Sequence, residues 1–149
     1  MSSSHAALEP KLARFEHVCL EAGLKLTHQR MMIFRELAAA SDHPSAETLY
    51  VRLKKNLPTL SLDTVYRTLA LFEELRLVSR VQTPESHARF EAEMESHHHA
   101  ICLKCNGITD FEWENFDTAN LPEQLARWGM IENKQVTVRG LCARCAAKK

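Results

Sequence analysis

Four of the five cysteines form two Cys-x2-Cys pairs, Cys102 with Cys105 and Cys142 with Cys145. Each pair can present two thiolates from one tight turn, and four thiolates satisfy the tetrahedral coordination of structural zinc. A redox dithiol or disulfides would use the same residues differently. We favour zinc, because the chain is expected in the cytosol, where thiols stay reduced. A shared metal would tie the second pair to the middle of the chain.

A second group of potential metal ligands lies around the first cysteine pair. In a strand, His97 and His99 point to one face and His98 to the other. Glu91 belongs to the preceding predicted strand and Asp110 to the following one. Such a mixture of imidazoles and carboxylates suits Fe(II), Mn(II) or Zn(II), and favours iron or manganese over a purely structural zinc. The alternative is a solvated histidine run near ordinary surface carboxylates.

Composition limits the classes of protein that the chain can belong to. Its 149 residues are 45% hydrophobic, enough for one domain or two small ones, and its formal net charge is zero. The sequence contains no run of about 18 apolar residues that would predict a membrane span. Its N-terminal stretch lacks the basic-then-apolar order of a signal peptide. These features predict a cytoplasmic protein. The charge splits into +2 for residues 1–82 and −2 for the rest, a sign that suits a DNA-facing first part.

The first part of the chain is predicted to be helical and to end in a hairpin. Apolar residues recur at helical spacing from Leu8 to Cys19, a cysteine that we interpret as a small apolar core residue. Three further helices are predicted to begin after the N-caps Thr27, Ser45 and Ser61. Residues 77–82 and 87–93 predict two short strands. This order is typical of a winged helix-turn-helix.

On this interpretation, residues 61–75 form the recognition helix. The face opposite its apolar stripe is predicted to carry Thr64, Arg67 and Thr68, with Tyr66 at the edge. Arg67 and Tyr66 could contact phosphates or base edges of DNA. The alternative is the solvated face of an ordinary helical bundle.

The second part of the chain is predicted to be a small α/β domain. Residues 98–102, 108–111 and 136–141 predict strands, and a helix is expected around Pro122–Trp128. The cysteine pairs fall at strand ends, where turns could present four sulfurs to one ion. The boundary is expected near Thr83–Ser86, giving domains of 1–83 and 84–149 and an α+β fold class overall.

These segments together resemble the ferric uptake regulator superfamily of bacterial transcription repressors. The resemblance runs from about Leu8 to Cys145. Its marks are LTHQR (26–30), DHPSAETLY (42–50), SLDTVYRTLALFEELRLV (61–78), RFE (89–91), HHHAICLKCNGITDF (97–111) and GLCARC (140–145). It implies a winged-helix DNA-binding domain followed by an α/β dimerisation domain, in a homodimer that binds an inverted-repeat operator.

The resemblance also implies two kinds of metal site. The four paired cysteines would hold structural zinc. The regulatory ion, Fe(II) or Mn(II), would be held by ligands from both domains, namely His43, Glu91, His97, His99 and Asp110. One ion bridging two domains would favour the domain arrangement in which all its ligands meet.

The branch of the superfamily is indicated by a few positions. Asp110, where iron-uptake members tend to have Glu, resembles the peroxide-sensing repressors, in which bound Fe(II) and peroxide oxidise a ligand histidine; His43 or His97 corresponds to it here. Glu91 departs from that branch. The stretch HHHA lacks the aspartate of the iron-uptake HHDH, and Asn133 and Lys134 stand where a histidine is common. A repressor of iron uptake or a zinc sensor remains the alternative.

Two other classes of protein compete with the repressor. A metal-dependent enzyme could activate water at the histidine and glutamate cluster, but it needs an open coordination position and a substrate pocket. The sequence contains no HExxH motif and suggests no nucleophile–base pair. A zinc-stabilised interaction module without a DNA role would share the cysteines and lack a DNA-contacting helix. We therefore expect no enzymatic activity.

Overall fold

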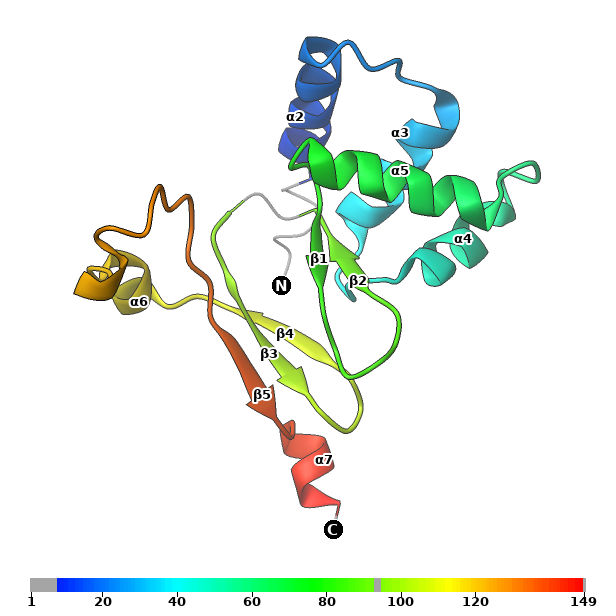
Figure 1. Ribbon diagram of the computed structural model, residues 1–149. Coiled ribbons are helices and arrows are strands. Elements are labelled where there is room, and N and C mark those ends of the chain that lie inside the picture. Colours follow the sequence, from blue (N-terminus) through cyan, green and yellow to red (C-terminus); the bar gives the residue numbers. More distant parts are fainter. Residues whose placement is uncertain (1–7, 93–94, 149) are drawn as a thin grey trace. The chain divides into compact units, whose positions relative to one another are not determined.

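A computed structural model of the chain describes residues 8–92 and 95–148. The chain divides into two compact units, Met1–Met94 and Glu95–Lys149 (Figure 1). The loop in which the sequence set the domain boundary lies inside the first unit. The assignment of DNA binding to one part and dimerisation to the other stays a prediction.

The first unit is built from four helices that begin as the sequence predicted. Side-chain oxygens of Thr27, Ser45 and Ser61 accept hydrogen bonds from the backbone N–H three residues later, at 3.1–3.2 Å. These caps satisfy N–H groups that a helix leaves unpaired in its first turn. The helices are α2 (Leu8–Glu21), α3 (His28–Ala39), α4 (Ala46–Lys54) and α5 (Leu62–Glu74).

Three phenylalanines from different helices form the centre of the first unit. The Phe15 and Phe34 rings stack with centroids 4.2 Å apart, and Phe72 meets them edge-on at 5.2 and 5.9 Å. Pairs of this geometry add roughly 0.5–1.5 kcal/mol each beyond the burial of the rings. Cys19 is buried in the same cluster, and its burial raises the pKa of its thiol. Its predicted role as a core residue is confirmed.

A short hairpin completes this unit as a winged helix-turn-helix. Strands β1 (Ser79–Val81) and β2 (Arg89–Glu91) pair antiparallel, with Arg80 opposite Phe90. Both strands are shorter than predicted, and Glu93, at the end of the second predicted strand, lies outside the described residues. The backbone N–H of Phe90 donates to the carbonyl of Pro44 at 3.0 Å. The hairpin is thereby joined to the turn that precedes α4.

The second unit contains a three-stranded sheet in the order β4-β3-β5 (Figure 1). The central strand β3 (His98–Cys102) is antiparallel to β4 (Ile108–Phe111) and parallel to β5 (Thr137–Gly140). All three strands were predicted from the sequence. Because β3 and β5 are parallel, their C-terminal ends meet at the same edge of the sheet. A short helix, α7 (Ala143–Ala147), follows β5.

The helix predicted around Pro122–Trp128 is wrong. That segment contains only one 3-10 turn, η1 (Glu123–Leu125), and the α-helix of this region is the short α6 (Glu114–Thr118). Almost every side chain from Leu121 to Met130 is exposed. Most helical stability in proteins comes from packing an apolar face, and this segment has no partner on which to pack it within the described residues.

Among the described residues, no helix is both long enough and apolar enough to span a bilayer.

His43 generates a test of the backbone in the first unit. Its φ of 50° lies in the left-handed region, which costs a residue with a Cβ roughly 1–2 kcal/mol. Both His43→Ala and His43→Gly remove the ring, but only glycine avoids this cost. We expect the glycine variant of the metal-free protein to be the more stable by about 1 kcal/mol. Urea unfolding followed by helical circular dichroism measures the difference.

Ala70→Gly on the exposed face of α5 supplies the matched control. There glycine should destabilise by about 1 kcal/mol, the ordinary sign for a helix interior. A His43→Gly variant less stable than His43→Ala would contradict the left-handed conformation of this turn.

Candidate metal centres

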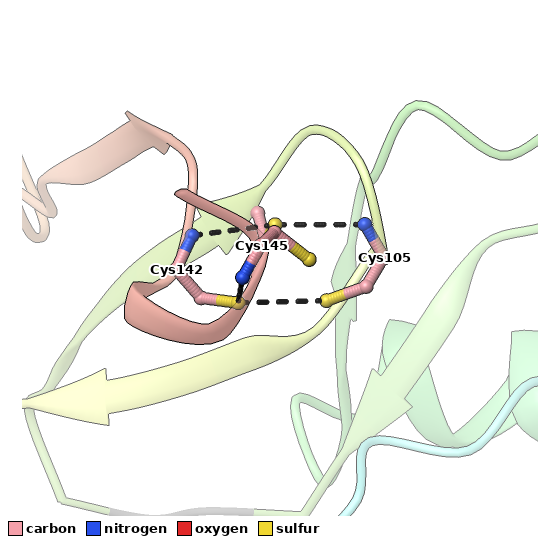
Figure 2. Close-up of side chains that lie close together, drawn as sticks. Cys105, Cys142 and Cys145 are labelled. Carbon is pink, nitrogen blue, oxygen red and sulfur yellow. Dashed lines mark hydrogen bonds between the residues drawn. The ribbon is translucent and has the colours of Figure 1, made fainter. Parts of the chain in front are cut away.

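The two cysteine pairs meet at the edge of the sheet where β3 and β5 end. Cys102 is the last residue of β3. Cys105 lies in the following turn, and Cys142 caps the helix that contains Cys145 (Figure 2 labels these three). Their four sulfurs all lie within 4.8 Å of one another. The Sγ atoms of Cys105 and Cys142 are 3.9 Å apart, close to the ~3.8 Å expected between sulfurs that surround zinc tetrahedrally. The residues present therefore fit a zinc ion.

The backbone explains why these sulfurs converge. Cys102 lies opposite Gly140 in the parallel register, so the chain leaves both strands at the same level. The N–H of Leu103 then donates to the carbonyl of Gly140 at 2.8 Å. A side chain at Gly107 would put its Cβ 3.3 Å from the sulfur of Cys105, so glycine leaves room for the turn.

Hydrogen bonds to the sulfurs favour thiolates, the form that binds metal. Backbone N–H groups of Cys105 and Cys142 donate to Cys102 Sγ at 3.5 and 3.4 Å and lower the pKa of Cys102 to about 6. A similar bond from the N–H of Cys145 lowers the pKa of Cys142. The pKa of Cys145 rises to about 12, first because of its hydrogen bond with the Cys142 sulfur. A divalent cation would remove this obstacle to the last deprotonation.

A buried histidine–carboxylate pair lies in the first unit. His43 comes from the turn before α4 and Glu91 from the end of β2, and the distance from His43 Nε2 to Glu91 Oε2 is 3.0 Å. Both side chains are less than a tenth exposed. A buried imidazole beside a buried carboxylate offers one nitrogen and one oxygen donor to a metal ion.

A second group of donors lies in the second unit, on neighbouring strands. The Nε2 atoms of His97 and His99 are 3.1 Å apart. Asp110 lies opposite His99 in the register of β3 and β4, with its carboxylate 3.4 Å from His99 Nε2 and 3.9 Å from His97 Nε2. The aspartate is 42% exposed, whereas His99 is buried. The residues predicted as regulatory ligands thus form one group in each unit, and their union at a single ion stays a prediction.

His98 points away from these donors and connects β3 to two other segments of the second unit, α6 and the residue before β5. Its Nε2 donates to Asp117 Oδ1 at 2.8 Å, while its Nδ1 accepts the N–H of Val136 at 3.0 Å. The ring is 1% exposed and meets the rings of Phe111 and Phe116. The two-residue period of a strand predicted its face, but no sequence signal indicated Asp117 as its partner.

The residues predicted to contact DNA do not share one face of α5. Arg67 is 80% exposed and pairs with Asp63 at 2.8 Å, and Thr64 is partly buried beside the Ser61 cap. Thr68 is only 6% exposed, so its predicted location on the exposed face is wrong. Helical spacing explains the error, because position 68 lies on the same side as the buried Val65 and Phe72.

Tyr66 has a partner that the sequence did not reveal. Its hydroxyl, on an exposed part of α5, donates to Glu47 Oε1 in the first turn of α4. This hydrogen bond raises the pKa of Tyr66 and lowers the pKa of Glu47. It orients the ring from a neighbouring helix, and a contact between residues 19 positions apart leaves no local pattern in the sequence.

Comparison with known proteins identifies the family. The model of the "Ferric uptake regulator family" matches residues 21–138. The peroxide-responsive repressor PerR of Staphylococcus epidermidis is 29% identical over 148 residues, covering 97% of each chain.

Solved structures agree with this match. The ferric uptake regulator Fur of Helicobacter pylori, described as having three functional metal binding sites, superposes with a TM-score of 0.75 at 27% identity over 93% of each chain. The Pseudomonas aeruginosa ferric uptake regulator with manganese gives 0.69 at 28% identity, covering 84% of this chain and 95% of that one. With its winged helix-turn-helix, its cysteine cluster and a family match over most of its length, the chain belongs to the ferric uptake regulator family.

Proposed function

We propose that the protein is a cytoplasmic, homodimeric transcription repressor that binds an inverted-repeat operator when loaded with metal and releases it on exposure to peroxide. The observation that carries the proposal is the buried His43–Glu91 pair at 3.0 Å. In a regulator of this family, a metal ion bound by this pair would be attached directly to the first unit, which carries the helix proposed to contact DNA.

The two kinds of donor suit two kinds of metal. The sulfurs of Cys102, Cys105, Cys142 and Cys145 would hold structural zinc and leave no coordination position open. The mixed nitrogen and oxygen donors of His43, Glu91, His97, His99 and Asp110 would hold regulatory Fe(II) or Mn(II). Ligands drawn from both units would bias the arrangement of those units by the difference in metal affinity between arrangements.

DNA contact is assigned to the exposed side chains of α5. Arg67, Tyr66 and Thr64 are the candidates that remain after the burial of Thr68 is taken into account. Arginine can donate two hydrogen bonds to a guanine edge or to a phosphate, and tyrosine can donate one. Dimerisation is assigned to the second unit, whose described residues include exposed apolar side chains at Leu103, Trp128, Met130, Val138 and Leu141.

Peroxide sensing is favoured over plain metal sensing by Asp110 and by curated relatives named as peroxide-responsive repressors. Bound iron(II) would supply the one-electron chemistry that starts cleavage of the peroxide O–O bond and would be regenerated, because the histidine ring supplies both electrons in the net reaction. In the net reaction, one peroxide oxygen would replace hydrogen on a ring carbon of His43 or His97, and the other would leave as water. The oxidised ring would be a poorer ligand, so metal and operator would be released. An iron-uptake or zinc-responsive repressor of the same family is the alternative.

The zinc assignment is tested by removing one thiolate. Cys142→Ser should abolish zinc binding and unfold or monomerise the second unit, because structural zinc stabilises small domains by roughly 10 kcal/mol or more. Cys19→Ser, at a buried cysteine outside the cluster, should retain zinc and the dimer. Metal analysis and analytical ultracentrifugation measure both. Full zinc content in Cys142→Ser would remove this cysteine from the site.

Operator binding is tested with DNA selected from a random library by the Mn(II)-loaded protein. Arg67→Ala should weaken binding by about 5- to 150-fold, the value of a good contact to a base edge. Arg35→Ala, at an exposed arginine of α3, removes the same charge elsewhere and should leave affinity within a few-fold. Titrations at several salt concentrations separate phosphate from base contacts. A dimer that selects no inverted repeat under any metal condition would refute the repressor.

Peroxide sensing is tested by peptide mass spectrometry. After dilute peroxide, the Fe(II)-loaded protein should gain one oxygen on a peptide containing His43 or His97, and the Mn(II)-loaded protein should remain unmodified. If the Fe(II)-loaded protein also keeps its mass while still requiring metal to bind operator, plain metal sensing replaces the peroxide proposal.

A further inference from the structure

The guanidinium of Arg89 holds the backbone of the turn that presents His43. Its Nε donates to the carbonyl of His43 and its Nη2 donates to the carbonyl of Asp42 at 2.7 Å. Its Nη1 lies 3.4 Å from a carboxylate oxygen of Glu85, in the loop of the hairpin. The side chain is 18% exposed. One planar guanidinium therefore donates hydrogen bonds to two consecutive carbonyls of a turn about 46 residues away in sequence.

The turn needs such support, because its conformation is unfavourable for its sequence. His43 has a φ of 50° and is followed by Pro44, and the residue before a proline prefers an extended backbone. A left-handed residue with a Cβ persists only where its surroundings hold it. Further support comes from β2, through the bond from Phe90 N–H to Pro44 O and the bridge between Ser45 and Arg89.

Arg89 and Glu91 act on the same histidine from one strand. They stand two positions apart on β2, so their side chains leave the strand on the same face. Arg89 holds the backbone of His43, and Glu91 lies 3.0 Å from its ring. The strand thus fixes both ends of the residue, and the ring has little freedom left to lose when it becomes a ligand.

We propose that Arg89 is a positioning residue: by holding the carbonyls of Asp42 and His43, it sets the imidazole of His43 beside Glu91 and raises the affinity of the regulatory site for divalent metal. The inference rests on the proposed function, because it takes His43 and Glu91 to be ligands. Residues that orient ligands typically change metal affinity by about 10- to 100-fold when they are altered.

The shape of the guanidinium, not its charge, is the feature that matters. A lysine keeps the positive charge but lacks the planar fork that can donate to two fixed acceptors. The charge itself opposes binding of a divalent cation nearby. Arg89→Lys therefore separates orientation from electrostatics, and a loss of affinity in Arg89→Gln would occur despite the removal of a repelling charge.

The test measures Mn(II) affinity of the full-length, zinc-containing protein by isothermal titration calorimetry. Arg89→Lys should bind Mn(II) at least about 10-fold more weakly than the original protein. Arg80→Lys is the matched control, because Arg80 lies on β1 of the same hairpin. Its guanidinium lies over the Phe90 ring and donates to Glu73 of α5, and it does not hold the His43 turn. It should change the affinity by less than about 3-fold.

A spectroscopic measurement separates positioning from general stability. With Co(II) in the regulatory site, the visible d–d bands report ligand geometry, so they should shift in Arg89→Lys and stay unchanged in Arg80→Lys. An equal Mn(II) affinity for Arg89→Lys and the original protein would overturn the inference, whatever the Co(II) spectra show. If Arg89→Lys does not fold, Arg89→Gln is measured with the same expectation of weaker binding.

A third variant distinguishes failure of this inference from failure of the proposed function. His43→Ala should lose tight Mn(II) binding. If it binds Mn(II) as tightly as the original protein, the ligand assignment is wrong, and the role of Arg89 is overturned with it. If His43→Ala loses the metal while Arg89→Lys retains it, the ligand assignment stands and the positioning role is rejected.

Discussion

The parallel pairing of β5 with β3 is the constraint on which the second unit depends. Without it, the two cysteine pairs would not lie at one edge of the sheet, since they follow strands separated by 34 residues. Parallel strands need a long crossover, and this one contains β4, the short α6 and a single 3-10 turn, without a long helix. All four residues of β5 are exposed. Burial therefore contributes little to holding this strand, which leaves its fixation to the backbone hydrogen bonds with β3 and to the cysteine cluster and its metal.

The first unit has a different source of stability. Its helices close over a buried aromatic cluster, and three of them start at side-chain caps. Nothing in this core involves a cysteine pair. On the proposed function, removal of structural zinc would thus damage the frame that carries His97 and His99 while leaving the His43–Glu91 pair organised within its own unit. On that function, the regulatory ligands of the first unit would be supported independently of the zinc, and those of the second unit would depend on it.

Local patterns predicted most of this fold from the sequence. The caps at Thr27, Ser45 and Ser61 and the alternation of His97–His99 each depend on residues within a few positions of one another, so the sequence carries them directly. The helix expected near Pro122 failed because helical composition cannot supply a surface to pack against. Thr68 failed because polarity was taken as exposure, although its helical position faces the core.

In the candidate sites too, the sequence predicted the features that depend on neighbouring residues and missed those that depend on distant ones. Cysteine spacing revealed which residues form the cluster in the second unit, because two residues in one tight turn necessarily present their sulfurs together. Arg89, Asp117 and Glu47 act through partners 46, 19 and 19 residues away, and no local pattern marks them. Side chains that support a ligand or a contact residue are defined by tertiary structure alone. The resemblance to a family therefore predicted the metal ligands of this chain but not the side chains that support them.

The organisation of the donors within each unit has a consequence for regulation. His43 is held through its backbone by Arg89 and through its ring by Glu91, and His99 is fixed by strand pairing opposite Asp110. Ordering individual side chains would then take little of the metal's binding free energy. On the proposed function, most of that free energy remains available to bias the arrangement of the two units, which is the quantity that operator binding would sense. If the ligand side chains were not already ordered, metal would bind more weakly. A smaller share of its binding free energy would then bias the arrangement of the two units.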